Sequence, residues 1–159
     1  MPKVKDLSGC YMMFNNGQLD FDEEYLSDFF NDGTTNKRPI KNLTYFFYSS
    51  KITNLPENFL ASVDNTVTDV TAMCTSCAYL TTVGKWLSNQ TNLTTIRALY
   101  KGCSRLSLNT AIETIPSNNK IEDAREAFKS VGTSASTSTV NETALKNLFD
   151  TLTSVVNVD

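Results

Sequence analysis

The stretch that decides the fold is VTDVTAMCTSCAYLTTV, residues 67–83. Its apolar side chains stand at positions 0, 3, 6, 7, 10, 13 and 16 when Val67 is counted as position 0. The stretch LTTIRALYKGCSRL, residues 93–106, has apolar side chains at the first six of these positions, and its Cys103 matches Cys77. Because a pattern that recurs at a fixed spacing is the signature of repeat architectures, the sequence predicts stacked repeats.

Three weaker copies surround these two units. Leu7 and Ile40 each start a copy that keeps the first four positions, and Ile121 starts a last copy whose second half is lost. The five starts are 33, 27, 26 and 28 residues apart, so the period is close to 27 with one insertion, which we assign to residues 31–36. We name the copies units 1 to 5. A second apolar series has the same period and supports the register: Tyr25-Leu26, Phe59-Leu60 and Trp86-Leu87.

Each unit predicts the same local structure. Positions 0, 3, 6 and 7 form one face of a helix of about two turns. The next residues, 77–83 in unit 3, are rich in Thr and predict a short extended segment. Such a unit cannot bury its apolar face alone, so neighbouring units must stack. The sequence therefore predicts an α/β repeat fold, a right-handed solenoid of about four to five irregular coils over residues 1–131.

The C-terminal residues differ from the repeats. Residues 132–140 are almost all Gly, Ser, Thr and Ala, which predicts a linker. Asn141 is a suitable helix N-cap, and apolar residues then follow at helical spacing up to Val156. Residues 141–159 therefore predict a helix that either caps the open end of the solenoid or serves as a docking or oligomerisation element.

Composition excludes several classes of function. The chain has no histidine, which removes His-based acid–base chemistry, Ser–His and Cys–His nucleophile pairs, and His-containing metal sites. A net charge of -3 gives no electrostatic reason to expect nucleic acid as a partner. The N-terminus shows no secretory signal, and no stretch is long enough for a transmembrane helix. We therefore expect a chain made in the cytoplasm that is not an enzyme, needs no cofactor and is not inserted in a membrane.

Two clusters invite a functional interpretation. Cys74 and Cys77 form a CxxC pair, but a metal site needs further ligands. Cys74 stands at position 7, where other units have Phe or Tyr, and Cys77 shares position 10 with Cys103. We interpret both as buried packing residues without metal. The acidic cluster of Asp20, Asp22, Glu23 and Glu24 lacks the EF-hand loop pattern, so we interpret it as a solvated face.

Residues 67–83 and 93–106 resemble the BspA-type leucine-rich repeats. In these, a valine–methionine–phenylalanine ladder is followed by glycine-cysteine and then by a leucine-threonine strand. The resemblance covers residues 7 to about 131, and the chain departs from it where Leu108-Asn109 interrupts unit 4 and where unit 5 lacks its strand. This repeat type occurs in bacterial surface proteins and in structural proteins of bacteriophages of gut bacteria. The resemblance implies a leucine-rich-repeat solenoid that serves adhesion or protein recognition.

The leading hypothesis is a non-catalytic recognition module of the adhesion type that binds a protein or a glycan. The alternative is a structural subunit of a phage virion, such as a tail or capsid fibre component, with homo-oligomer contacts through the C-terminal helix. A small inhibitor of a host protein is a third hypothesis. The extended segments should align polar side chains on one binding surface, formed by Thr53, Asn54, Thr81, Thr82, Lys85, Ser107 and Asn109.

Overall fold

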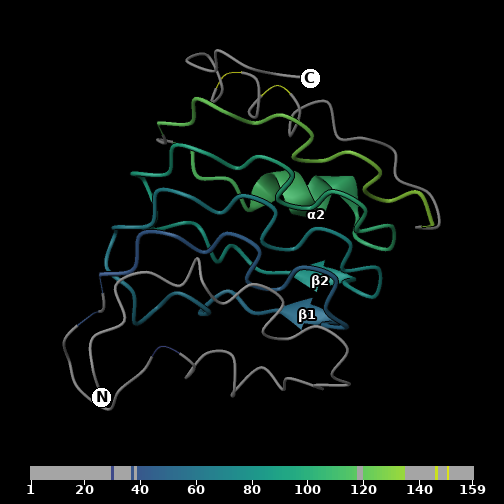
Figure 1. The fold of residues 1–159 in the computed structure, drawn as a ribbon, viewed down its shortest axis with the longest axis horizontal. Helices are drawn as coiled ribbons and strands as arrows, with labels where there is room; N and C mark the ends of the chain where they lie inside the picture. Colours follow the sequence, from purple (N-terminus) through teal and green to yellow (C-terminus); the bar gives the residue numbers. More distant parts are fainter. Residues whose placement is uncertain are drawn as a thin grey trace.

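The computed structural model describes residues 30, 37, 39–117, 120–134, 146 and 150. The elements named among them are the strands β1 (Asn54–Leu55) and β2 (Thr82–Val83) and the helix α2 (Leu108–Glu113). The rest of this part of the chain runs as coils that lie one above another, from the blue unit 2 to the green unit 5 (Figure 1). Lys146 and Asp150 are helical and form an ion pair. Unit 1, apart from residues 30, 37 and 39, and the other residues of the predicted C-terminal helix lie outside the described residues.

Matching residues of successive units lie side by side. β1 pairs with β2 in parallel, with Asn54 opposite Thr82 and Leu55 opposite Val83. Parallel bridges join the position-2 residues of units 2 to 5, in the order Asn42, Asp69, Thr95 and Asp123. The repeat register found in the sequence is therefore also the register of backbone pairing.

The segment from position 3 to position 10 of each unit is a run of turns. The amides at positions 6, 8 and 10 donate to the carbonyl oxygens three residues earlier in the same unit. The amides at positions 5, 7 and 9 donate instead to positions 4, 6 and 8 of the next unit. In unit 3 these bonds run from Ala72 to Arg97 (2.8 Å), from Cys74 to Leu99 (3.0 Å) and from Ser76 to Lys101 (2.7 Å). The predicted helices of about two turns are therefore wrong, and we call this segment the turn ribbon.

Left-handed residues make the turn ribbon possible. Positions 5 and 9 have positive φ in units 2 to 5, and only Gly102 among them is glycine. The others have φ between 51° and 62° and are Tyr45, Ser49, Ala72, Ser76, Ala98, Glu126 and Ser130. This conformation is unfavourable for L-residues by about 1–2 kcal/mol each. Here the amides of these residues in units 2 to 4 point at the next unit, so the bonds between units offset the strain.

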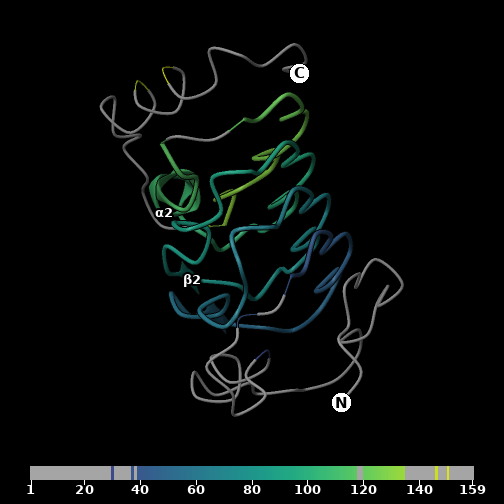
Figure 2. The same ribbon diagram turned by 90° about the vertical axis from the view of Figure 1, so that its left-hand side faces the viewer.

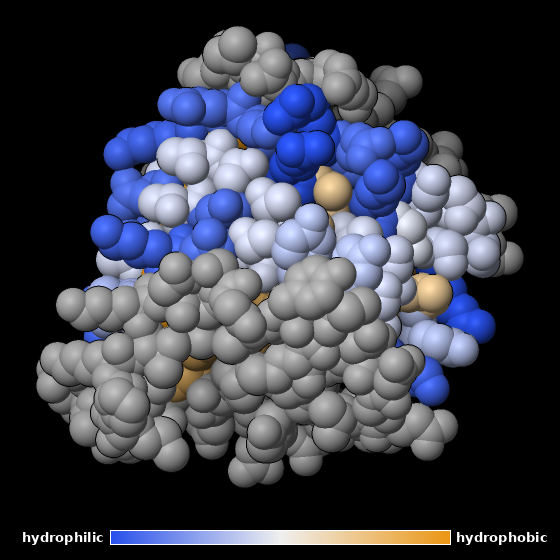
Figure 3. All heavy atoms as spheres, in the orientation of Figure 1, coloured by the Kyte–Doolittle hydropathy of each residue, from blue (hydrophilic) through white to orange (hydrophobic). Residues whose placement is uncertain are grey.

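The core lies inside the coils, and all seven apolar positions of unit 3 are buried. Figure 2 shows β2 and α2 on one side of the stack, with the turn ribbons stacked on the opposite side. We call these sides the strand face and the turn face. The described surface in the view of Figure 3 is mostly hydrophilic. Between units 2 and 3 the core is an aromatic cluster with ring centroids of neighbouring members 4.8–6.1 Å apart, made of Phe30, Phe46, Phe47, Phe59 and Trp86.

The start of the predicted linker is part of the fold. The amide of Gly132 donates to Cys103 at 3.3 Å, and the amide of Ser134 donates to Ser104 at 2.8 Å. Residues 132–134 therefore bond to unit 4, and unit 5 continues past the boundary at residue 131 that the sequence predicts. The rest of the predicted linker, residues 135–140, lies outside the described residues.

Candidate binding surface

Four of the seven predicted surface residues lie together on the strand face. The Thr82 hydroxyl donates to Asn54 Oδ1 at 3.0 Å across the pair of strands. The amide and the hydroxyl of Thr81 both donate to the carbonyl oxygen of Thr53, at 2.9 and 3.1 Å. The side chains of Thr53, Thr81 and Thr82 are exposed and that of Asn54 is half-buried. We call these four residues the Thr/Asn ladder.

Lys85 lies beside the Thr/Asn ladder at the end of β2. Its side chain is exposed. The residue before it, Gly84, donates its amide to Leu55 at 2.8 Å and so extends the pairing of the two units. A Cβ atom on Gly84 would lie 2.5 Å from the backbone nitrogen of Glu57, so only glycine lets the backbones approach this closely. At this end of the ladder the backbones at Gly84 and Glu57 are therefore packed tightly together.

The two remaining predicted residues belong to α2 and not to an extended segment. Ser107 is the N-cap of α2, without a side-chain capping bond, and Asn109 is in its first turn. Both are half-buried. Since α2 lies next to β2, it takes the place of the extended segment expected in unit 4. The Thr/Asn ladder therefore includes only units 2 and 3, and α2 of unit 4 packs beside it.

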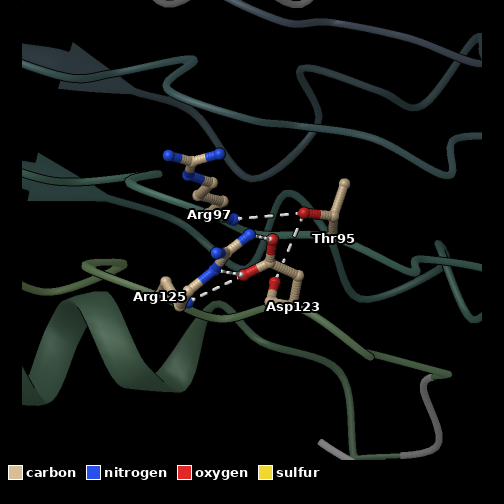
Figure 4. A network of polar contacts seen from close by, with 4 residues as sticks. All are labelled: Thr95, Arg97, Asp123 and Arg125. Carbon is tan, nitrogen blue, oxygen red and sulfur yellow. Dashed lines mark hydrogen bonds and ion pairs between the residues drawn. The ribbon is translucent and has the colours of Figure 1, made fainter. Parts of the chain in front are cut away.

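The polar side chains at position 2 form a second ladder along the β-bridges. These side chains bond to the backbone of their own unit. In each unit the side chain at position 2 accepts the amide at position 4. The acceptors are Asn42 (2.8 Å), Asp69 (2.8 Å), Thr95 (3.4 Å) and Asp123 (3.1 Å). Figure 4 shows the last two of these contacts. Short polar residues favour such local bonds, so an Asn, Asp or Thr at every position 2 is a sequence signal that periodicity of apolar residues misses.

The turn face of units 4 and 5 has a group of basic residues that the sequence analysis did not single out. Position 4 has Arg97 and Arg125, position 8 has Lys101 and Lys129, and position 12 of unit 4 has Arg105. At positions 4 and 8, and at or next to position 12, units 2 and 3 together have one basic residue, Lys51 at position 11 of unit 2. We call the five basic residues of units 4 and 5 the basic grid: Arg97, Lys101, Arg105, Arg125 and Lys129.

Two carboxylates lie within the basic grid. The Glu126 carboxylate bonds Lys101 at 2.6 Å and Lys129 at 2.5 Å, and these hydrogen bonds lower its pKa to about 2. Arg125 donates to both carboxylate oxygens of Asp123, at 3.0 and 2.7 Å, and its hydrogen bonds lower the pKa of that carboxyl. Both carboxylates are therefore charged at neutral pH and each already has a basic partner.

An exposed aromatic residue adjoins the basic grid. Tyr79 of unit 3 is 46% exposed, and the Arg105 guanidinium lies 5.0 Å from its ring centroid. This distance is suitable for a cation–π interaction. Tyr and Arg are the residue types that most often carry binding energy in protein interfaces. The turn face thus has a composition typical of an interaction surface.

The three cysteines of the described residues are buried free thiols. Cys77 donates to the Phe47 carbonyl at 2.9 Å, and Cys103 donates to the Cys74 carbonyl at 3.0 Å, so each position-10 thiol bonds to the unit before it. Burial raises the pKa of Cys74 and of Cys103, which keeps both thiols protonated and unreactive. Among the described residues no group of three or more His, Cys, Asp or Glu is arranged to hold a metal ion.

This chain matches no family model, no curated protein and no solved structure. Within the described ranges, no helix combines the length and the apolar character needed to span a bilayer. The two candidate binding surfaces of the described residues are the Thr/Asn ladder on the strand face and the basic grid of units 4 and 5.

Proposed function

We propose that this chain is a non-catalytic recognition module, built as a short BspA-type leucine-rich-repeat solenoid, which binds a polar protein surface or a glycan through its strand face. The observation that carries the proposal is the Thr/Asn ladder. Its four residues come from two units and are held in register by the β1–β2 pair. A binding group on a paired backbone loses little conformational entropy on binding, and this favours affinity.

The chemistry of the ladder suits neutral polar partners. Asn54 Oδ1 accepts the Thr82 hydroxyl, which leaves the Asn54 Nδ2 group to donate towards solvent. The Thr81 and Thr82 oxygens both donate within the protein and keep lone pairs that accept. A sugar hydroxyl both donates and accepts a hydrogen bond, so neighbouring donors and acceptors of this kind match it. Lys85 adds one exposed cation beside them.

The alternative proposal is a structural subunit of a phage virion, such as a tail or capsid fibre component. The observation that favours it is the uneven distribution of charge, because the described basic residues gather on units 4 and 5. A subunit of an assembly needs contacts between copies, whereas a recognition module does not depend on them. Glycan binding by a variant that stays monomeric would therefore favour the leading proposal over the alternative.

A glycan array tests the leading proposal. We expect the full-length protein to bind neutral oligosaccharides, and the double variant Asn54→Ala/Thr82→Val to bind them at least tenfold more weakly. The matched control is Ser49→Ala/Ser76→Ala on the turn face, which alters the same number of polar side chains. Both serines stand at left-handed position 9, and Ala72 and Ala98 show at position 5 that alanine adopts this conformation here. Equal binding by the ladder variant and the wild type would exclude the ladder as the site.

A further inference from the structure

The basic grid and the N-terminal acidic residues lie in different parts of the chain. Residues 1–39 contain seven acidic and four basic residues, whereas residues 93–134 contain six basic and four acidic ones. Residues 40–92 contain three of each. The net charge of -3 therefore hides a chain that is acidic before unit 2 and basic in units 4 and 5. Such an arrangement favours contacts between opposite parts of two molecules.

The basic grid already shows how it holds a carboxylate. Lys101 and Lys129 occupy the same position in adjacent units, and the single carboxylate of Glu126 bonds both. Arg125 holds Asp123 through two nitrogen atoms, the geometry in which guanidinium groups bind carboxylates. The spacing of the units and the type of the side chains are therefore suited to carboxylates.

Two guanidinium groups of unit 4 remain for an external partner. The Arg97 guanidinium points away from Asp123 (Figure 4), and no carboxylate of the described residues forms an ion pair with it. Arg105 contacts the Tyr79 ring and likewise has no carboxylate partner among them. Both residues are exposed. They lie four residues to either side of Lys101 in unit 4, Arg97 on the turn ribbon and Arg105 just after it, so a short acidic peptide can contact both.

We propose that this surface binds a second copy of the chain through the acidic run of residues 20–24, which contains Asp20, Asp22, Glu23 and Glu24. The basic grid is on units 4 and 5, so the two contacting surfaces are different parts of the chain. Such a contact between copies is heterologous, and repeated contacts of this type build a ring or an open filament. The proposal is independent of the Thr/Asn ladder.

The contact is electrostatic, so ionic strength controls it. Exposed ion pairs are individually weak. Charge screening acts over about 30 Å at 0.01 M salt but only about 3 Å at 1 M. The full-length protein should therefore associate at low salt and return to monomers at high salt. An assembly through the apolar C-terminal helix would show the opposite trend or no trend, because salt does not weaken apolar contacts.

Sedimentation velocity of charge-reversal variants tests the proposal. We expect Arg97→Glu/Arg105→Glu to weaken low-salt association at least tenfold, and Asp22→Arg/Glu23→Arg to do the same. A chain with all four changes should regain association, because the swapped charges attract again. The control, Lys51→Glu/Lys85→Glu, alters the net charge equally at exposed residues outside the grid and should associate more strongly than the Arg variant.

Three results would overturn the proposal. The first is a wild-type protein that stays monomeric at low salt, which is also the result if the acidic run binds the basic grid of its own chain. The second is association that survives the Arg97→Glu/Arg105→Glu change. The third is a chain with all four charge reversals that folds, as judged by its circular dichroism spectrum, but does not associate. None of these results affects binding to glycans through the strand face, so the two proposals fail separately.

Discussion

Units 2 and 3 share their backbone with units 4 and 5 but differ from them in core and surface. All four units have the position-2 bridge and left-handed residues at positions 5 and 9. Units 2 and 3 enclose an aromatic cluster, pair through β1 and β2, and have one basic residue at the outward positions that correspond to the basic grid. Units 4 and 5 enclose Tyr100 among mostly aliphatic side chains, have α2 in place of a strand, and present the basic grid. The backbone bonds therefore define the fold, and the side chains define what each half can do.

The two halves also stabilise their interiors differently. Phe59 lies at the centre of the aromatic cluster and contacts its four other rings, those of Phe30, Phe46, Phe47 and Trp86. A chain of hydrogen bonds joins Trp86, at the edge of this cluster, to the core of unit 4. Trp86 Nε1 donates to the Tyr100 hydroxyl at 2.8 Å, which donates to Thr114 at 3.1 Å. The first half depends on apolar contact area and the second also on buried polar bonds.

Phe59→Ala should have the largest effect, because it removes the central ring of the aromatic cluster. We expect a loss of about 3–5 kcal/mol in the free energy of unfolding, measured by urea denaturation. Phe128→Ala is the matched control in unit 5, where the ring is partly exposed and has one aromatic neighbour among the described residues, Tyr100, at 6.4 Å. Equal losses from the two substitutions would contradict the idea that the aromatic cluster distinguishes the two halves.

Tyr100→Phe tests the hydrogen-bonded half. It keeps the ring, which position 7 accepts because Phe47 occupies it in unit 2, and removes only the hydroxyl. Trp86 then loses its buried acceptor, and we expect a loss of about 1–3 kcal/mol. Tyr79→Phe removes an exposed hydroxyl and should change stability by less than about 0.5 kcal/mol. If Tyr100→Phe changes the free energy of unfolding as little as Tyr79→Phe does, the chain of hydrogen bonds does not stabilise the core.

The apolar spacing in the sequence predicted the register and the core. Val70 and Ile96 are buried at equivalent positions, and Cys77 and Cys103 form equivalent bonds to the unit before them. Local conformation was harder to predict. Bonds between residues three apart place apolar side chains at the spacing of a helix, so the turn ribbon looks helical in sequence. Its left-handed residues are mostly not glycine, so no glycine pattern reveals them.

The candidate surfaces were predictable to different degrees. The Thr/Asn ladder follows from register alone, because two Thr-rich segments in successive units must lie side by side. The interruption at Leu108 was visible, but it was not recognised as the start of α2. The basic grid was missed because net charge averages over the chain. It becomes visible only when outward positions of neighbouring units are compared, and this requires the turn ribbon to be known.

The charged surface of units 4 and 5 also has a consequence for stability at acid pH. The ordinary pKa of a Glu side chain is 4.5, and the hydrogen bonds from Lys101 and Lys129 lower that of Glu126 to about 2. A carboxyl whose pKa is lower in the folded state binds fewer protons there than in the unfolded chain. Its contribution to stability is therefore complete above pH 4.5 and is lost as the pH falls towards 2.

Glu126→Gln should have the smallest effect on stability. It tests whether part of the stability lost at acid pH arises from units 4 and 5. Near pH 7 the variant should be only slightly less stable than the wild type, because partly exposed ion pairs contribute little. Between pH 4.5 and 2, urea denaturation at low salt should show a shallower loss of stability for the variant. Glu122→Gln, at an exposed neighbour, serves as the control. If both variants lose stability with the wild-type pH dependence, the two lysines do not hold Glu126 in solution, and the acid sensitivity arises elsewhere in the chain.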